Sequence, residues 1–135
     1  MPQATRKPVI LVVDDEELLL KSVKHRLERE GFQVLTAATG EDGLKAAQEQ
    51  RPDLVLLDIM LPKLKGREVC ARLKANPATA DIPVIFLTAL GLADHVQGGM
   101  AAGAEDYIIK PFQAEELTER IIVCLARHNH WPPRG

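Results

Sequence analysis

Short apolar runs separated by helix-like segments recur along the whole 135-residue chain. Five of these runs have the length and composition of strands that are covered on both faces, as is typical of parallel sheets. They span residues 8–13, 33–37, 54–57, 84–88 and 106–109. Because helical patterns alternate with these runs, the chain is predicted to form an α/β domain whose parallel sheet carries helices on both sides.

The segments between the runs have the apolar spacing of amphipathic helices. Leu19, Val23 and Leu27 show it most clearly. Helices are predicted around these three residues, over residues 41–50 and 67–75, within residues 93–102, and over residues 114–127. The helix within 93–102 should be the least rigid, because Gly98 and Gly99 each cost about 1 kcal/mol relative to alanine in a helix interior.

Length and charge are consistent with one folded domain over residues 8–127. Residues 1–7 and 128–135 are predicted to be flexible tails, and the second could also begin a linker. The 17 basic and 19 acidic residues are spread along the chain, so neither a nucleic-acid-binding tail nor a membrane-surface patch is predicted. The apolar runs are too short for a signal peptide or a membrane span, which favours a cytoplasmic protein.

The two cysteines and the last two histidines are predicted to have structural and not functional roles. Cys70 and Cys124 lack CxxC spacing and lie in helix-like patterns, so both are interpreted as reduced thiols in or near the core. His128 and His130 form an HxH pattern that could hold a transition metal weakly. A frayed chain end is the favoured interpretation of that pattern.

Polar residues end four of the five predicted strands. Asp14 and Asp15 follow the first strand, Asp58 follows the third, Thr88 closes the fourth, and Lys110 follows the fifth. In an open parallel sheet, ligands bind outside the carboxyl ends of the strands. These side chains are therefore expected to meet in one site.

Three carboxylates in one site need a cation beyond Lys110. Two carboxylates about 5 Å apart repel by roughly 3 kcal/mol at an effective dielectric constant near 20. Oxygen ligands alone favour Mg²⁺, or Mn²⁺, over Zn²⁺. Such a site suits phosphate chemistry, because the metal and Lys110 offset phosphoryl charge and the Thr88 hydroxyl can donate to a phosphoryl oxygen. Asp58, at the centre, is the candidate nucleophile that forms an aspartyl-phosphate.

Four segments together resemble a known family. In this order and spacing, VVDDEE, LLDIMLPKLKG, VIFLTAL and GAEDYIIKPF resemble the receiver domain of bacterial two-component response regulators, of the chemotaxis-regulator-like type. The resemblance covers residues 8–127. It implies a flavodoxin-like fold, a doubly wound five-stranded parallel sheet with strand order 2-1-3-4-5. It also implies a signalling receiver that catalyses only its own phosphorylation and dephosphorylation.

The resemblance assigns a role to each residue of the acidic site. Asp58 would accept the phosphoryl group from a histidine kinase or a histidine phosphotransfer protein. Asp15, Asp58 and the backbone carbonyl of Met60 would bind Mg²⁺ directly, with Asp14 acting through water. Lys110 would contact the phosphoryl group.

The resemblance also implies how the signal leaves the site. Thr88 and Tyr107 would form a switch pair, and Pro111 would follow a cis peptide bond. The fourth helix, fifth strand and fifth helix would present the change to a downstream protein or output domain. The same face is a candidate homodimer interface, and no direct contact with nucleic acid or membrane is expected.

Four residues near the acceptor site differ from the family pattern or affect its chemistry. Lys63 and Lys65 stand where relatives often have glycine and an acidic residue, so the loop beside Asp58 is unusually basic. Met60 and Leu90 occupy positions that tune phosphoryl lifetime in the family. Neither can orient an attacking water by hydrogen bonding, which predicts slow self-dephosphorylation.

The sequence fits other functions less well than that of a receiver. A haloacid-dehalogenase-type phosphohydrolase would carry DxD after its first strand, whereas here Asp14 and Asp15 are contiguous and the best nucleophile follows the third strand. A nucleotide-binding module lacks its glycine-rich phosphate loop. An unphosphorylated adaptor is disfavoured because every acceptor-site residue is present. A stand-alone regulator, a relay shuttle and a receiver cut from a longer protein all remain open.

Overall fold

The elements of the chain alternate between strand and helix in a computed structural model that describes residues 6–89, 103–128 and 130. The predicted helix within residues 93–102, most of the two predicted tails and Leu90 lie outside the described residues. The described elements are β1 (Val9–Val13), α1 (Glu17–Arg29), β2 (Gln33–Ala37), α2 (Gly40–Gln50), β3 (Leu54–Asp58), α3 (Gly66–Ala75), β4 (Val84–Ala89), β5 (Asp106–Lys110) and α5 (Ala114–Arg127).

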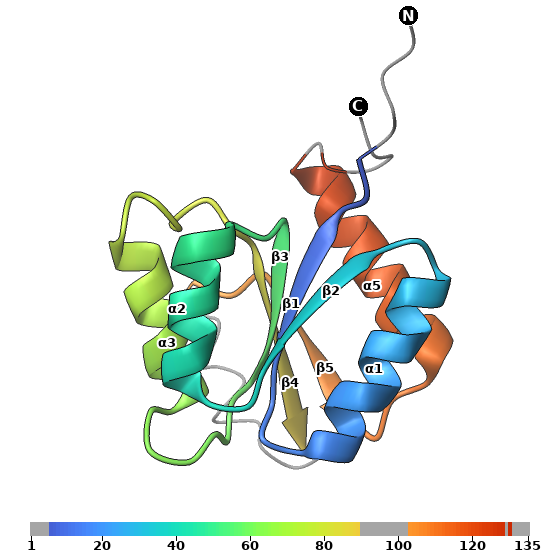
Figure 1. Ribbon diagram of the computed structural model, residues 1–135, viewed down its shortest axis with the longest axis horizontal. Coiled ribbons are helices and arrows are strands. Elements are labelled where there is room, and N and C mark those ends of the chain that lie inside the picture. The colour runs from blue at the N-terminus through green and yellow to red at the C-terminus, as the bar shows by residue number, and fades with distance from the viewer. Residues whose placement is uncertain (1–5, 90–102, 129, 131–135) are drawn as a thin grey trace, which may run out of the picture.

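The five strands form one parallel sheet in the order β2-β1-β3-β4-β5. Figure 1 shows α1 and α5 on one face of the sheet, and α2 and α3 on the other. The predicted fold class and strand order are therefore confirmed. Each predicted strand agrees with the observed one to within one residue at either end, because the sheet pairing extends β3 to Asp58 and β4 to Ala89.

Two apolar cores, one on each face, hold the sheet between the helices. Successive residues of β3 point to opposite faces. Leu54 and Leu56 belong to the core under α1 and α5, while Val55 and Leu57 belong to the core under α2 and α3. All four are at most 1% exposed. This double burial explains why the run is continuously apolar rather than alternating.

The Asp53 carboxylate bonds to residues from both ends of the chain at the amino end of the sheet. Its carboxylate accepts two hydrogen bonds from Arg6 at 3.0 Å and one from the Val9 N–H at 2.7 Å. His130 Nδ1 lies 3.1 Å from the same carboxylate. Burial by itself would raise the pKa of Asp53, but the hydrogen bonds from Arg6 and Val9 outweigh it, and the net pKa is lowered. The carboxylate is thus ionised at this end of the fold.

Among the described residues, no helix is both long and apolar enough to cross a membrane.

Replacing Leu56 by alanine should lower the free energy of unfolding by about 2–5 kcal/mol, because the change leaves a cavity beside the central strand. Leu18 is a matched control, since its side chain is 81% exposed. Leu18→Ala should change the stability by less than about 0.5 kcal/mol. Urea denaturation followed by circular dichroism measures both effects. Equal losses in the two variants would contradict the burial described here.

Candidate functional site

The carboxyl ends of β1 and β3 bring three predicted acidic residues together. Oxygen atoms of Asp14, Asp15 and Asp58 all lie within 4.8 Å of one another. Asp14 and Asp58 are buried, whereas Asp15 is exposed. Lys110 reaches the same place from the end of β5. The sheet therefore assembles the acidic cluster and the ammonium group expected from the sequence.

Lys110 is the cation that meets these carboxylates. Its Nζ lies 2.8 Å from Asp14 Oδ2 and 3.5 Å from Asp58 Oδ2. Burial by itself would lower the pKa of Lys110, but the hydrogen bond to Asp14 and the attraction of the surrounding carboxylates outweigh it and raise the pKa. The side chain is therefore a permanent positive charge near neutral pH.

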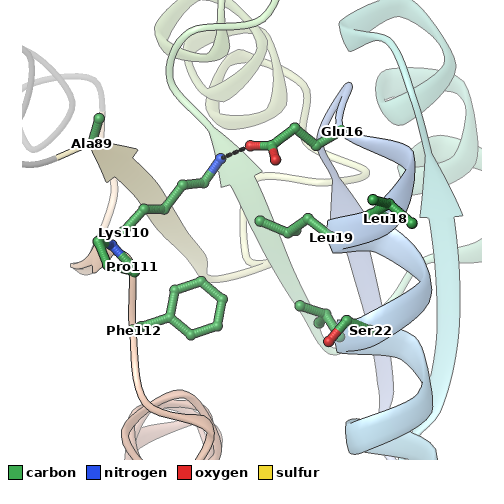
Figure 2. Close-up of a pocket in the computed structure, with 9 residues that line it drawn as sticks. Glu16, Leu18, Leu19, Ser22, Ala89, Lys110, Pro111 and Phe112 are labelled. Atoms are coloured by element: carbon green, nitrogen blue, oxygen red, sulfur yellow. Dashed lines mark ion pairs between the residues drawn. The ribbon is translucent and has the colours of Figure 1, made fainter.

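Glu16 is a further acidic residue at the site that the sequence reasoning did not single out. Its Oε1 lies 3.5 Å from Lys110 Nζ, and Figure 2 shows this ion pair at the edge of the site. The signal for it was present, because Glu16 directly follows the acidic pair that ends the first strand. Its side chain is 64% exposed, so solvent screens much of its attraction for Lys110.

Asp58 is held by its own backbone at the tip of β3. Its Oδ1 accepts the N–H of Met60 at 3.0 Å. Burial is the largest cause of a raised pKa at Asp58, and the neighbouring Asp14 and Asp15 add to it, although Met60 and Lys110 act in the opposite direction. The ionised form is thus disfavoured by its surroundings, and an added cation would relieve this penalty.

Asp14 has both carboxylate oxygens engaged. Oδ1 accepts the N–H of Glu16 at 2.9 Å, and Oδ2 accepts the ammonium of Lys110 at 2.8 Å. Its side chain is fully buried. These bonds fix the orientation of Asp14 and leave Asp15 and Asp58 as the less constrained carboxylates of the cluster.

The loop that follows β3 is shaped by a close backbone approach at Gly66. A Cβ at this position would overlap the carbonyl oxygen of Asp58 and would lie 2.8 Å from Cα of Ile59. The Gly66 N–H donates to the Ile59 carbonyl at 3.0 Å. Lys63, within the same loop, has a φ of 61°, a left-handed conformation in which glycine is favoured. Only glycine at position 66 lets α3 begin directly against the acidic site.

The three remaining predicted residues lie on or directly after β4 and β5. Thr88 lies near the end of β4 with its side chain buried, and its hydroxyl lies 3.4 Å from the carbonyl of Ala89. Tyr107 pairs in register with Phe86 and packs against the core under α2 and α3. The Lys110–Pro111 peptide bond is cis, as expected.

An open groove of about 630 Å³ adjoins the site. Figure 2 shows it between α1 and the segment that follows β5, with Leu19 and Phe112 facing each other across it and Lys110 at one end. Its lining is formed by Glu16, Leu18, Leu19, Ser22, Val23, Ala89, Lys110, Pro111 and Phe112.

Sequence comparison matches residues 10–122 to the family described as the response regulator receiver domain. The chain is 44% identical over 120 residues to the phosphate regulon transcriptional regulatory protein PhoB of Rhizobium meliloti, covering 89% of this chain and 53% of that protein. It is 44% identical over 126 residues to the DNA-binding dual master transcriptional regulator RpaA of Synechocystis, covering 93% of this chain and 52% of that protein. The chain thus spans about half the length of the curated relatives it matches.

Solved structures show the same fold at lower identity. A response regulator receiver domain protein of Methanospirillum hungatei superposes with a TM-score of 0.86 at 31% identity, covering 92% of this chain and 98% of that one. The receiver domain of a sensor histidine kinase from Pseudomonas aeruginosa superposes with a TM-score of 0.83 at 29% identity, covering 90% of this chain and 99% of that one. That structure is described with a magnesium ion coordinated in its active-site cleft.

Asp58→Asn should make the chain more stable near neutral pH when divalent cations are removed with EDTA. The pKa of Asp58 is raised in the folded chain, so folding disfavours its ionised form. The resulting loss of stability is absent at pH values below the ordinary carboxyl pKa of about 3.9 and develops as the pH rises through the raised value.

Chemical denaturation at a series of pH values compares this variant with Asp81→Asn, which changes an exposed carboxylate elsewhere. The difference between Asp58→Asn and the parent should disappear in acid, and Asp81→Asn should follow the parent throughout. An Asp58→Asn variant that is less stable than the parent near neutral pH would show that the carboxylate is not penalised by its site.

Proposed function

The chain belongs to the response regulator receiver domain family, and we propose that it accepts a phosphoryl group on Asp58 from the phosphohistidine of a histidine kinase or phosphotransfer protein. Its place as a phosphoacceptor module of two-component signalling follows from family membership. One observation carries the choice of residue. Asp58 is the carboxylate of the acidic cluster that ends the central strand, 3.5 Å from the Lys110 ammonium, whereas both oxygens of Asp14 already accept hydrogen bonds.

We assign Mg²⁺ to the cluster of Asp14, Asp15 and Asp58. The donor set fits a hard cation, because it consists of oxygen atoms within 4.8 Å of one another and carries more negative charge than Lys110 offsets. Asp15, Asp58 and the carbonyl of Met60 would hold the ion, with Asp14 acting through water; Mn²⁺ has the same ligand preference. The bound ion would supply positive charge to the phosphoryl oxygens during transfer.

The chain's own residues then perform the transfer. An Asp58 carboxylate oxygen forms a bond to phosphorus while the bond between phosphorus and the donor imidazole nitrogen breaks. Lys110 offsets the charge on the phosphoryl oxygens, and the Thr88 hydroxyl donates to one of them. The reaction is the chain's own modification, so the protein acts as a signalling receiver and not as an enzyme for an external substrate.

The groove beside Lys110 suggests how the donor approaches. Leu18 is 81% exposed at its rim, and Leu19 and Phe112 line it (Figure 2). A helix of the donor protein with an apolar stripe could lie in this groove and direct its phosphohistidine toward Asp58. We place this encounter in the cytoplasm.

Phosphorylation would be passed on through a surface change. We propose that Thr88 moves toward the phosphoryl group and that Tyr107 turns inward, altering the face that includes β5 and α5. An output domain, a separate protein or a second copy of the chain would bind that face. The relatives include a DNA-binding regulator about twice as long, and we assign any contact with DNA to a further domain and not to this one.

The haloacid-dehalogenase alternative is not favoured. The family match covers most of the chain, and the proposed nucleophile Asp58 ends β3 and not β1. Asp14, which follows β1, has both oxygens occupied by hydrogen bonds.

Incubation with Mg²⁺ and a small acyl phosphate should phosphorylate the chain on Asp58, as located by peptide mass mapping. The label should be lost in Asp58→Asn, retained in Asp81→Asn and prevented by EDTA. Lys110→Ala should slow the reaction by about 10²-fold or more, because it removes a preorganised charge. A label that persists in Asp58→Asn and disappears in Asp14→Asn would support the hydrolase instead.

The phosphorylated chain should lose its phosphoryl group slowly, over minutes or longer. The Met60 side chain is 46% exposed beside Asp58, but it offers no strong hydrogen bond to orient an attacking water. Met60→Asn supplies an amide at this position and should shorten the half-life by roughly tenfold. Met60→Leu is the matched apolar control and should leave the half-life unchanged. A half-life of seconds in the unsubstituted chain would refute this expectation.

A further inference from the structure

A second group of potential metal ligands lies at the opposite end of the sheet from Asp58. Glu105 precedes β5, and its N–H donates to the Val84 carbonyl at the start of β4. Cys124 lies on α5, and His128 is the residue that caps the carboxyl end of that helix. One ligand atom from each of these three side chains lies within 4.8 Å of the other two. In Figure 1 this end of α5 lies away from the carboxyl ends of the strands.

We propose that Glu105, Cys124 and His128 form a Zn²⁺ site that is separate from the acidic site. Cys124 and His128 are four residues apart along α5, so they share one helix face, and Glu105 approaches that face from the neighbouring loop. A sulfur, an imidazole nitrogen and a carboxylate oxygen are the three ligand types that zinc accepts in proteins. Three protein ligands leave a fourth tetrahedral position for water.

The distances within the cluster are close to those of a metal centre. Ligands around tetrahedral zinc are separated by about 3.5 Å, given bond lengths of about 2.0–2.3 Å. Cys124 Sγ already lies 3.5 Å from Glu105 Oε2. His128 Nε2 contacts the other oxygen of Glu105, and the ion would replace that contact. Only small side-chain movements are therefore needed.

The burial of the three ligands also suits an ion that enters from solvent. Cys124 is 1% exposed, whereas the side chains of Glu105 and His128 are 26% and 30% exposed. The sulfur lies in the apolar core under α1 and α5, and the other two ligands form the outer rim. Water can reach the rim side of the cluster and complete the coordination.

The two sites should not compete for the same metal. Asp14, Asp15 and Asp58 offer only carboxylate oxygens, which favour Mg²⁺. Thiolate and imidazole ligands instead favour zinc over magnesium. Saturation of the acidic site with Mg²⁺ should therefore leave the zinc site free.

A structural interpretation of the same residues is the alternative to be tested. Without a metal, burial and the nearby Glu105 raise the pKa of the Cys124 thiol to about 12, so the thiol stays protonated and donates to Glu105. A positively charged His128 would pair with Glu105, and its charge would also stabilise the carboxyl end of α5 through the helix dipole. His130 is not part of this cluster, because it contacts Asp53 instead, so the HxH pattern does not supply two ligands to one site. A bound ion differs from this arrangement in displacing the thiol proton, since a coordinating thiol is deprotonated outright.

Titration of the full chain with Co²⁺ and Zn²⁺ in excess Mg²⁺ tests the proposal. Co²⁺ should produce a thiolate-to-cobalt charge-transfer band, and stoichiometric Zn²⁺ should abolish it. The band should be lost in Cys124→Ser and retained in Cys70→Ser, which alters the other buried cysteine. The acidic site cannot produce this band, because it contains no thiolate.

Histidine variants give a second, independent test of the proposed zinc site. His128→Gln should weaken Zn²⁺ binding, measured by calorimetry, by more than about a hundredfold, since loss of even an indirect partner of a metal ligand costs 10–100-fold. His25→Gln, an exposed histidine on α1, is the control and should bind as the parent does. His128 is part-exposed at a helix end, so this variant reports on the site even if Cys124→Ser does not fold. Absence of the band in the parent, or equal Zn²⁺ affinity in His128→Gln and the parent, would overturn the proposal and leave a structural hydrogen-bond cluster.

Discussion

The site depends on one ammonium group placed among buried carboxylates. Lys110 Nζ lies 2.8 Å from Asp14 and 3.5 Å from Asp58, although 96 residues separate Lys110 from Asp14 in the chain. A buried carboxylate without a partner is strongly unfavourable, and one ammonium partly offsets two of them. In the proposed function, the remaining negative charge would select a divalent cation, and the bound cation would then favour an anionic phosphoryl group. The proposed metal binding and phosphoryl transfer would thus both depend on carboxylate charge that Lys110 leaves unbalanced.

The carboxylates of Asp14 and Asp58 repel each other, so a rigid scaffold is needed to keep them close together. Two apolar cores bury the β3 residues that precede Asp58 from both faces and so fix the position of Asp58 at the tip of the strand. Gly66 allows α3 to start directly against the Asp58 carbonyl, and this closes the site from the loop side. The free energy gained by burying apolar side chains elsewhere in the domain therefore offsets the repulsion between these carboxylates.

Polar chemistry is segregated to the two ends of the sheet. The carboxyl ends carry the acidic cluster with Lys110, while the amino ends carry the Asp53 hydrogen bonds and the cluster of Glu105, Cys124 and His128. An ion at that cluster would fasten the last turn of α5 to the loop before β5. The surface that phosphorylation is proposed to change includes α5. A bound ion would therefore restrain this surface at the end of α5 that lies opposite Asp58.

Hydrophobic periodicity and the positions of polar residues after each run were enough to predict the parallel sheet and the meeting of Asp14, Asp58 and Lys110. These features are local in the sequence, and the geometry of parallel sheets converts them into neighbours without further information. The order of the strands came from resemblance, because periodicity does not specify order. Only the tertiary structure showed that Glu16 also reaches Lys110 and that Glu105 meets two residues of α5. Such contacts depend on helix rotation and on how loops of distant segments pack together, and neither leaves a periodic signal in the chain.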